Sequence, residues 1–468
     1  MKAKSNNDFA RGLGIGLGCH VGYLKSTFFD QVISFADTNS ELDRGFGTGA
    51  AWAWPYHNDD ATHTMIERMK TRGEFAKGVG FGLARVVRHF STDEREQMVD
   101  RLAWDSMFSE GFGEGTAQFL WTIYDEANNH QFLQLATNSP AISKGLGIGL
   151  GFMYSYIKNE LENDSYKPLF KADPNFRRSL GTGIGRIYRY LSEDARLEAF
   201  RKAEEDVEFA IGLSEGIATV YNYLEEQQKE LIMSYVDEDA GFSRGLGMGF
   251  GSVFSYFDDD VKKDILAHIV HNRQLSLGLG AGLAMHISYL SEVLTSKIFE
   301  LARNNSLLAV GLGEGWGIMF PYLSQATKHS LSSLGSIDSF AFGFGVGIGK
   351  IRVYLENSVF EKAAAFTKSN KFMEGFAIGL GSIAANLSKD LLFEILSMAA
   401  EDAYFAKNFG FGLGHTFSIL DSDKRKEILK IMRDREEDFL PDSGKVLAIM
   451  CHRQVAGLLK SLCTQQVL

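Results

Sequence analysis

Apolar side chains recur at steps of four residues in a series of short segments along the chain. In the first segment the positions of Leu13, Leu17 and Val21 are apolar, and the corresponding positions of later segments are mostly apolar as well. The position of Ile15, between them, becomes glutamate in some later segments. A β-strand would place this position on the same face as its apolar neighbours two residues away. The steps of four therefore predict amphipathic helices.

Glycine runs of the form Gly-x-Gly-x-Gly mark the same segments. The first glycine of each run, or the residue that replaces it, falls at Gly12, Gly45, Gly78, Gly111, Gly145, Ser179, Gly212, Gly245, Gly278, Gly311, Gly343, Gly375 and Asn408. Internal similarity at a period of about 33 residues is typical of solenoids, in which each unit buries its apolar face against its neighbours. The sequence therefore predicts an all-α fold, an α-solenoid of about thirteen helix-turn-helix repeats.

Helix-capping residues support these boundaries. Asparagine or aspartate stands six residues before the first glycine in most units, at Asn6, Asn39, Asp105, Asp173, Asp206, Asp239, Asn272, Asn305 and Asp402. The glycine-rich helix ends near a recurrent Tyr-Leu-Ser, whose serine can cap a second helix with a charged outer face. We predict repeats starting near residues 6, 39, 72, 105, 139, 173, 206, 239, 272, 305, 337, 369 and 402 within residues 1–440, and a C-terminal helical cap over residues 441–468.

The glycines predict unusually close helix packing. A glycine inside a helix costs about 1 kcal/mol relative to alanine, so packing must offset it. On a helical wheel Gly12 and Gly16 lie on one side and Gly14 and Gly18 on the other, so each glycine-rich helix can approach a neighbour on both sides. Gly16→Leu, or its equivalent Gly249→Leu, is therefore expected to be severely destabilising. The array should curve strongly, as an arc, ring or superhelix with these helices on its concave side, and the Tyr23 column should cover the neighbouring helix.

Composition narrows the functional classes. The 48 basic and 59 acidic residues give a net charge of -11, which argues against nucleic acid as a partner, because phosphate binding relies on clustered lysine and arginine. Cys19, Cys451 and Cys463 show no metal-ligand spacing, so we expect no metal and no cofactor. No apolar stretch reaches the roughly 20 residues of a membrane helix, and no signal-peptide core follows Met1. We expect no membrane insertion and a cytoplasmic location.

The predicted concave face follows the columns of Ile15, Cys19 and Gly22, which vary most between units. The candidate binding residues on it are Trp52, Arg85, Arg88, Glu114, Trp121, Arg186, Arg189, Glu215 and Glu314. The three glutamates share one column in units four, seven and ten, and an arginine pair stands in the unit before each of the first two. This super-repeat is either a charged ladder that binds a partner, or a set of ion pairs that fixes helix register or remains from duplication.

No Ser/His/Asp set, Cys/His set or metal-binding pair is visible, so we expect a protein that is not an enzyme. The period and two-helix unit are similar to those of tetratricopeptide solenoids, but the Trp, Leu-Gly and Tyr signature of that class does not map onto this chain. The first hypothesis is a scaffold that binds a protein or peptide on its concave face. Two alternatives remain: a tightly wound solenoid that holds a small molecule or ions in a Glu/Arg-lined lumen, and an enzyme whose site forms only in three dimensions.

Overall fold

The structure is a computed structural model, and all of its described elements are α- or 3-10 helices. It describes residues 7–20, 26–37, 39–57, 59–86, 105–123, 136–158, 173–287, 290–323, 333–367, 369–384 and 387–417, with a few shorter pieces up to residue 428. The predicted cap over residues 441–468 lies outside this part. Of the helices described, none is both long and apolar enough to cross a lipid bilayer.

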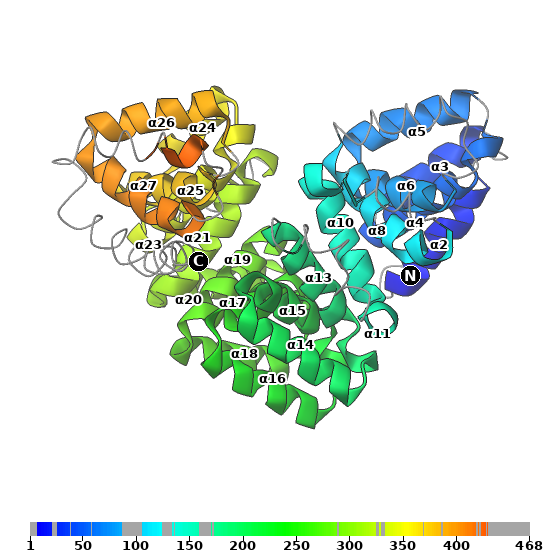
Figure 1. The fold of residues 1–468 in the computed structure, drawn as a ribbon, viewed down its shortest axis with the longest axis horizontal. Helices are drawn as coiled ribbons and strands as arrows, with labels where there is room; N and C mark the ends of the chain where they lie inside the picture. Colours follow the sequence, from blue (N-terminus) through cyan, green and yellow to red (C-terminus); the bar gives the residue numbers. More distant parts are fainter. Residues whose placement is uncertain are drawn as a thin grey trace, which may run out of the picture. The chain divides into compact units, whose positions relative to one another are not determined.

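The glycine runs lie in helices, as predicted. The glycine-rich helices are α2 (Asn7–Cys19), α4 (Ser40–Trp52), α6 (Gly73–Val86), α8 (Ser106–Ile123), α10 (Pro140–Phe152), α13 (Pro174–Arg186), α15 (Val207–Val220), α17 (Ala240–Val253), α19 (Arg273–His286), α21 (Ser306–Met319), α23 (Asp338–Ile351), α25 (Lys371–Ser382) and α27 (Ala403–Thr416). From α2 to α15, and again from α19 to α27, each packs directly on the next glycine-rich helix along the chain (Figure 1).

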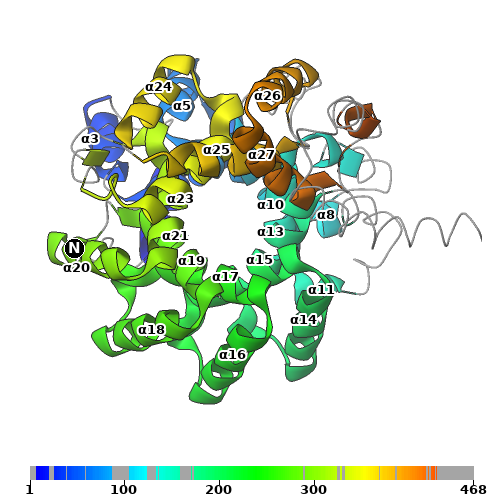
Figure 2. The same ribbon diagram turned by 90° about the vertical axis from the view of Figure 1, so that its left-hand side faces the viewer.

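A second set of helices covers the outside of this layer. These outer helices are α3 (Ser26–Ala36), α5 (Asp59–Thr71), α14 (Glu193–Glu205), α16 (Glu226–Glu238), α18 (Asp259–His271), α20 (Glu292–Asn304), α24 (Asn357–Phe366) and α26 (Lys389–Glu401). Several, such as α14 and α20, contact the glycine-rich helix that follows them. Figure 2 shows α14 and α16 on the outside of α13 and α15. The array is therefore two-layered, with the glycine-rich helices forming one continuous layer within each half of the chain.

The predicted capping residues act as expected. Asn39 accepts a hydrogen bond from the backbone N–H of Leu42 at 3.0 Å, and Asp206 accepts one from that of Phe209 at 3.0 Å. Ser192 caps the outer helix α14 in the same way. Each such bond satisfies a helix-start donor that has no partner inside the helix.

Short 3-10 helices, which the sequence pattern did not predict, follow many of the glycine-rich helices. They are η2 (Trp54–Tyr56), η5 (Tyr188–Tyr190), η6 (Tyr221–Tyr223), η7 (Phe254–Tyr256), η9 (Phe320–Tyr322) and η10 (Arg352–Tyr354); the short α-helix α11 (Tyr154–Ile157) takes this place after α10. The aromatic residue that opens η5, η6, η7 and η9 is buried. The tight turn thus places one ring in the core and directs the chain towards the outer helix.

The glycine faces explain the close packing. A methyl group placed on Gly151 of α10 would lie 2.6 Å from the carbonyl oxygen of Leu180 in α13, the next glycine-rich helix. One placed on Gly149 would lie 2.6 Å from the carbonyl oxygen of Glu114 in α8, the previous one. Alternate glycines of one helix therefore contact the helices on its two opposite sides, as the helical wheel predicts. On both sides the backbone of the glycine lies against the backbone of the neighbouring helix.

The first helix departs from this rule. On α2, a methyl group at Gly14 would lie 2.7 Å from the backbone nitrogen of Phe46, but at Gly12 and Gly16 it would meet no described atom within 4 Å. The expectation that Gly16→Leu is severely destabilising is therefore wrong, because this face of α2 is exposed and covers no neighbour within the described residues.

The contacts divide the chain into two compact units, residues 1–245 and 246–468. The boundary between them falls inside helix α17. Domains are usually separated by an exposed linker, and no such linker lies at this boundary. These parts are called unit 1 and unit 2, respectively.

Candidate functional site

Charged side chains gather on the glycine-rich helices of unit 1. We call this group the inner charged cluster, and it consists of Arg11 on α2, Arg44 on α4, Lys77 on α6, Glu110 and Glu114 on α8, Lys144 on α10 and Arg186 on α13. Its ion pairs join helices that are one or two repeats apart. The cluster therefore ties several repeats together through side chains.

Arg44 and Glu114 form the most buried pair of the cluster. Their Nη2 and Oε2 atoms are 2.6 Å apart, and the two residues are only 7 and 2 % exposed. Burial alone would raise the pKa of Glu114, but the charges of Arg44, Lys77, Arg186 and Arg11 together lower it. The cations that lower this pKa come from four other glycine-rich helices of unit 1, and Arg44 is the one with a printed contact to the carboxylate.

Glu110 lies one helical turn before Glu114 and is shared by two lysines. Its carboxylate contacts Lys77 Nζ at 2.5 Å and Lys144 Nζ at 2.7 Å. Burial opposes ionisation, yet the two ammonium groups hold the pKa of Glu110 at about 2. Burial and the nearby Arg44 lower the pKa of Lys77, with Glu110 acting in the other direction. Both lysines therefore share one carboxylate, and Glu41 and Glu74 add further negative charge near Arg44.

The three glutamates of the predicted super-repeat have three different partners. Glu114 pairs with Arg44, which lies two repeats earlier; Glu215 pairs with Arg178, one repeat earlier, at 2.9 Å. Glu314, in unit 2, pairs with Lys350, one repeat later, at 2.6 Å. Arg85 and Arg186, which precede the first two glutamates by one repeat, do not form these ion pairs. The carboxylates of this column are thus engaged in ion pairs within the chain.

The other predicted site residues lie in varied surroundings. Arg85 is exposed and its guanidinium lies 4.8 Å from the ring centre of the half-buried Trp52. Arg189 is exposed on η5, and Arg186 is half-buried at the end of α13. Arg88 lies outside the described residues, as does the side chain of Trp121. Of the predicted residues, only Glu114 and Arg186 belong to the inner charged cluster.

The sequence interpretation missed the column just before the first glycine of each run. This column supplies Arg11, Arg44, Lys77, Glu110 and Lys144. It lies four residues before the Ile15 column, and positions four apart share one helix face, so it continues the predicted inner stripe by one turn. The recurrence of lysine and arginine in this column could have predicted a cationic stripe on this face.

A second surface is formed by tyrosines, one in most repeats. We call it the tyrosine column, and its described members are Tyr56, Tyr156, Tyr190 and Tyr223 in unit 1 and Tyr256, Tyr322 and Tyr354 in unit 2. All seven are between 67 and 81 % exposed. The prediction that the Tyr23 column covers a neighbouring helix is therefore wrong for these residues, because their rings are mostly exposed. In η5, η6, η7 and η9 the aromatic residue that opens the turn is buried, and the tyrosine that closes it is exposed. Tyr23 itself lies outside the described residues.

Neighbouring members of this column lie close together in unit 1. The guanidinium of Arg189 is 4.9 Å from the ring centre of Tyr190 and 5.7 Å from that of Tyr223. One cation therefore bridges the rings of two consecutive repeats, an arrangement that cation–π attraction favours. The result is a contiguous exposed strip of two aromatic rings and a positive charge.

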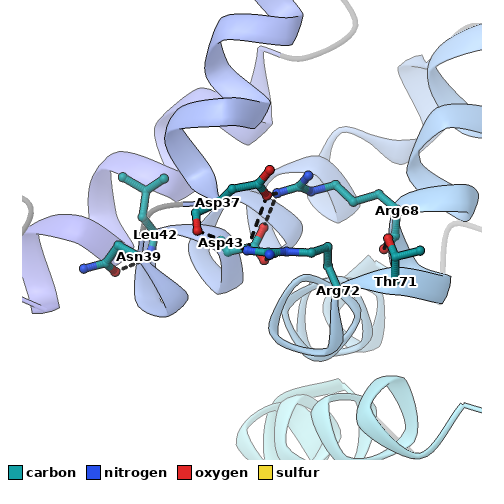
Figure 3. A network of polar contacts seen from close by, with 7 residues as sticks. All are labelled: Asp37, Asn39, Leu42, Asp43, Arg68, Thr71 and Arg72. Carbon is teal, nitrogen blue, oxygen red and sulfur yellow. Dashed lines mark hydrogen bonds and ion pairs between the residues drawn. The ribbon is translucent and has the colours of Figure 1, made fainter. Parts of the chain in front are cut away.

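A further polar network in unit 1 joins α4 and α5 to the residues that follow α3 (Figure 3). Arg68 contacts Asp43 at 2.6 Å and Asp37 at 2.8 Å, and Arg72 contacts the same two carboxylates at 3.2 and 3.3 Å. Two arginines thus balance two aspartates between packed helices. This balance fits a structural role.

Within the described ranges no three His, Cys, Asp or Glu side chains gather in a way that could hold a metal ion. Comparison with protein-family models, with curated proteins and with solved structures yields no match to this chain.

Proposed function

We propose that this chain is a non-enzymatic binding scaffold, a curved helical-repeat solenoid of about thirteen units that binds an extended segment of a partner protein. The observation that carries the proposal is the tyrosine column, because it exposes a large aromatic side chain at the same position of several repeats. Tyrosine gives much contact area at a low entropic cost and is enriched at protein interfaces.

The tyrosine column fits this role better than the glutamate column. Glu114, Glu215 and Glu314 are already paired with cations of the chain, so a partner would have to break those pairs to reach them. The rings of Tyr190 and Tyr223, with Arg189 between them, are exposed and preorganised. A surface that repeats with each unit suits an extended partner, which presents side chains at regular intervals.

The glycine contacts support the proposed curvature with the glycine-rich helices inside. These helices meet backbone to backbone through their glycines, whereas the outer helices carry long side chains on their surfaces. Layers with unequal spacing bend towards the tighter layer.

The test is the selection of peptides from a random displayed library with the full chain as target, followed by fluorescence anisotropy with the selected peptides. Tyr190→Ser combined with Tyr223→Ser should weaken binding about tenfold or more, because both ring contacts are lost. The matched control replaces Val270 and Val293, which are 70 and 80 % exposed on the outer helices α18 and α20, with serine and should leave binding unchanged. Equal affinities for the tyrosine variant and the wild type, or no selected peptide, would contradict the proposal.

A further inference from the structure

Tyr190 and Tyr223 differ from the rest of the tyrosine column because a cation lies between their rings. We call Tyr190, Arg189 and Tyr223 the tyrosine strip. Arg189 stands directly before its tyrosine, and at the other described members of the column this position is uncharged, with Pro55, Ser155, Asn222, Ser255, Pro321 and Val353. The two tyrosines are 73 and 67 % exposed and Arg189 is exposed as well, so a ligand can reach all three side chains.

The spacing of the two rings matches one turn of a polyproline II helix. The guanidinium carbon of Arg189 lies 4.9 Å from one ring centre and 5.7 Å from the other. The two ring centres are therefore no more than 10.6 Å apart, the sum of these distances. A polyproline II helix has three residues per turn and advances about 9 Å in that turn. A segment with proline at every third residue can thus place one pyrrolidine ring on each tyrosine.

Arg189 supplies hydrogen-bond donors between the two rings. Its guanidinium group carries five N–H donors and forms no ion pair with any carboxylate in the described ranges. The backbone carbonyl groups of a polyproline II segment are not used in internal hydrogen bonds, so they can accept from it. The same positive charge disfavours a lysine or arginine of the partner at this point, because like charges repel.

Charged residues of both signs follow the two tyrosines along the chain. Arg196 on α14 donates a hydrogen bond to the backbone carbonyl of Arg189 at 3.2 Å. Glu193 and Asp194 are the first residues of α14, and Glu226 is the first residue of α16. The charges near the strip in sequence are therefore mixed, so the rings and the N–H donors, rather than net charge, set the preference for a partner.

Other recurring ways of binding a peptide fit the tyrosine strip less well. Addition of a strand requires an exposed sheet edge, and all described elements of this chain are helices. An amphipathic helix lays its apolar face into a hydrophobic groove, and its carbonyl groups are paired within the helix. The strip instead offers two exposed rings with a hydrogen-bond donor between them.

We propose that the partner segment bound by the tyrosine strip is proline-rich and adopts the polyproline II conformation, with prolines three residues apart on Tyr190 and Tyr223 and a carbonyl group facing Arg189. This inference rests on the proposed function, which leaves the sequence of the partner segment open. Aromatic side chains are the usual contacts of such segments. Because the conformation is already formed in a free proline-rich chain, binding it costs little conformational entropy.

The test is fluorescence anisotropy of the full chain with two labelled peptides of identical composition. The regular peptide has proline at every third position of an alanine and serine background, and the irregular peptide has no two prolines three residues apart. The regular peptide should bind about fivefold more tightly or better, since it alone places prolines on both rings of the strip. Equal affinities, or no binding of the regular peptide, would overturn the proposal.

Variants of the tyrosine strip test the role of each side chain. Tyr223→Ser and Arg189→Gln should each weaken binding of the regular peptide about fivefold or more, whereas Tyr223→Phe should keep most of the affinity because the ring remains. The matched controls are Arg201→Gln on the outer helix α14 and Tyr354→Ser, a member of the column that is 81 % exposed. Both should bind as the wild type does. Circular dichroism checks that every variant folds, and wild-type affinity in Tyr223→Ser would contradict the assignment.

The library selection described for the proposed function separates the two claims. Selected peptides that carry prolines three residues apart support both of them. Selected peptides without proline whose binding is still lost in the Tyr190→Ser, Tyr223→Ser variant would keep the proposed function and overturn the proline-rich partner.

Discussion

Units 1 and 2 pack their glycine-rich helices in the same way, but the side chains next to the glycines differ between the two units. In unit 1 the column before the first glycine is mostly cationic, as at Arg11, Arg44 and Lys77. In unit 2 the same column begins with the half-buried Leu277, Val310 and Phe342. The glycines of both units nevertheless meet the neighbouring backbone in the same way. The packing of the repeat and the chemistry of its inner face are therefore set by different columns and vary independently.

The largest expected effect is common to both units. Gly147→Leu in unit 1 and Gly280→Leu in unit 2 should each destabilise the protein by about 3 kcal/mol or more, because even a methyl group there would lie 2.7 and 2.5 Å from a neighbouring carbonyl oxygen. Thermal unfolding followed by circular dichroism measures this. The control is Gly16→Ala, which faces open space and should stabilise α2 through its higher helix propensity. A large loss of stability in Gly16→Ala would contradict the packing scheme.

The next effect should differ between the units. Glu114→Gln leaves the buried guanidinium of Arg44 without its counter-charge and should cost about 3 kcal/mol. Glu314→Gln should cost about 1 kcal/mol, since its partner Lys350 reaches solvent with 32 % of its side chain exposed. Urea denaturation of the two variants compares them directly. Equal losses would mean that the inner charged cluster contributes no more to stability than a half-exposed pair.

Acid should act on the inner charged cluster through Glu110. The pKa of Glu110 is about 2, against an ordinary value of 4.5, because Lys77 and Lys144 outweigh the effect of burial. The ionised carboxylate therefore stabilises the fold above about pH 4.5, and this contribution is lost as the pH falls towards 2. The urea midpoint should fall over this range in the wild type and less steeply in Glu110→Gln. Superimposable pH profiles would show that the carboxylate makes no such contribution.

The smallest expected effect is again common to both units. Asp105→Ala in unit 1 and Asp402→Ala in unit 2 each remove a helix cap and should cost about 1 kcal/mol. Calorimetric melting temperatures of the two variants test this. A markedly larger loss at one of them would show that the two units do not start their helices alike.

Much of the fold was predictable because the helices depend on sequence patterns between residues that are close along the chain. Steps of four residues, the caps at Asn39 and Asp206, and the two glycine faces all depend on neighbours within one or two helical turns. The inner charged cluster was only partly predictable. Which cation pairs with Glu114 depends on how far side chains reach across two repeats, and spacing along the chain does not encode that distance. The exposure of Tyr190 depends on a 3-10 turn that helical periodicity does not reveal.

Alternate glycines on one helix have a consequence for how such a protein evolves. Because Gly149 and Gly151 face opposite neighbours through equivalent contacts, each repeat carries both halves of a single interface. Removing or inserting a whole repeat within the array joins surfaces that already fit, so a gene of this type can change length in steps of one repeat without inventing a new contact. The side chains beside the glycines are then free to diverge in each copy.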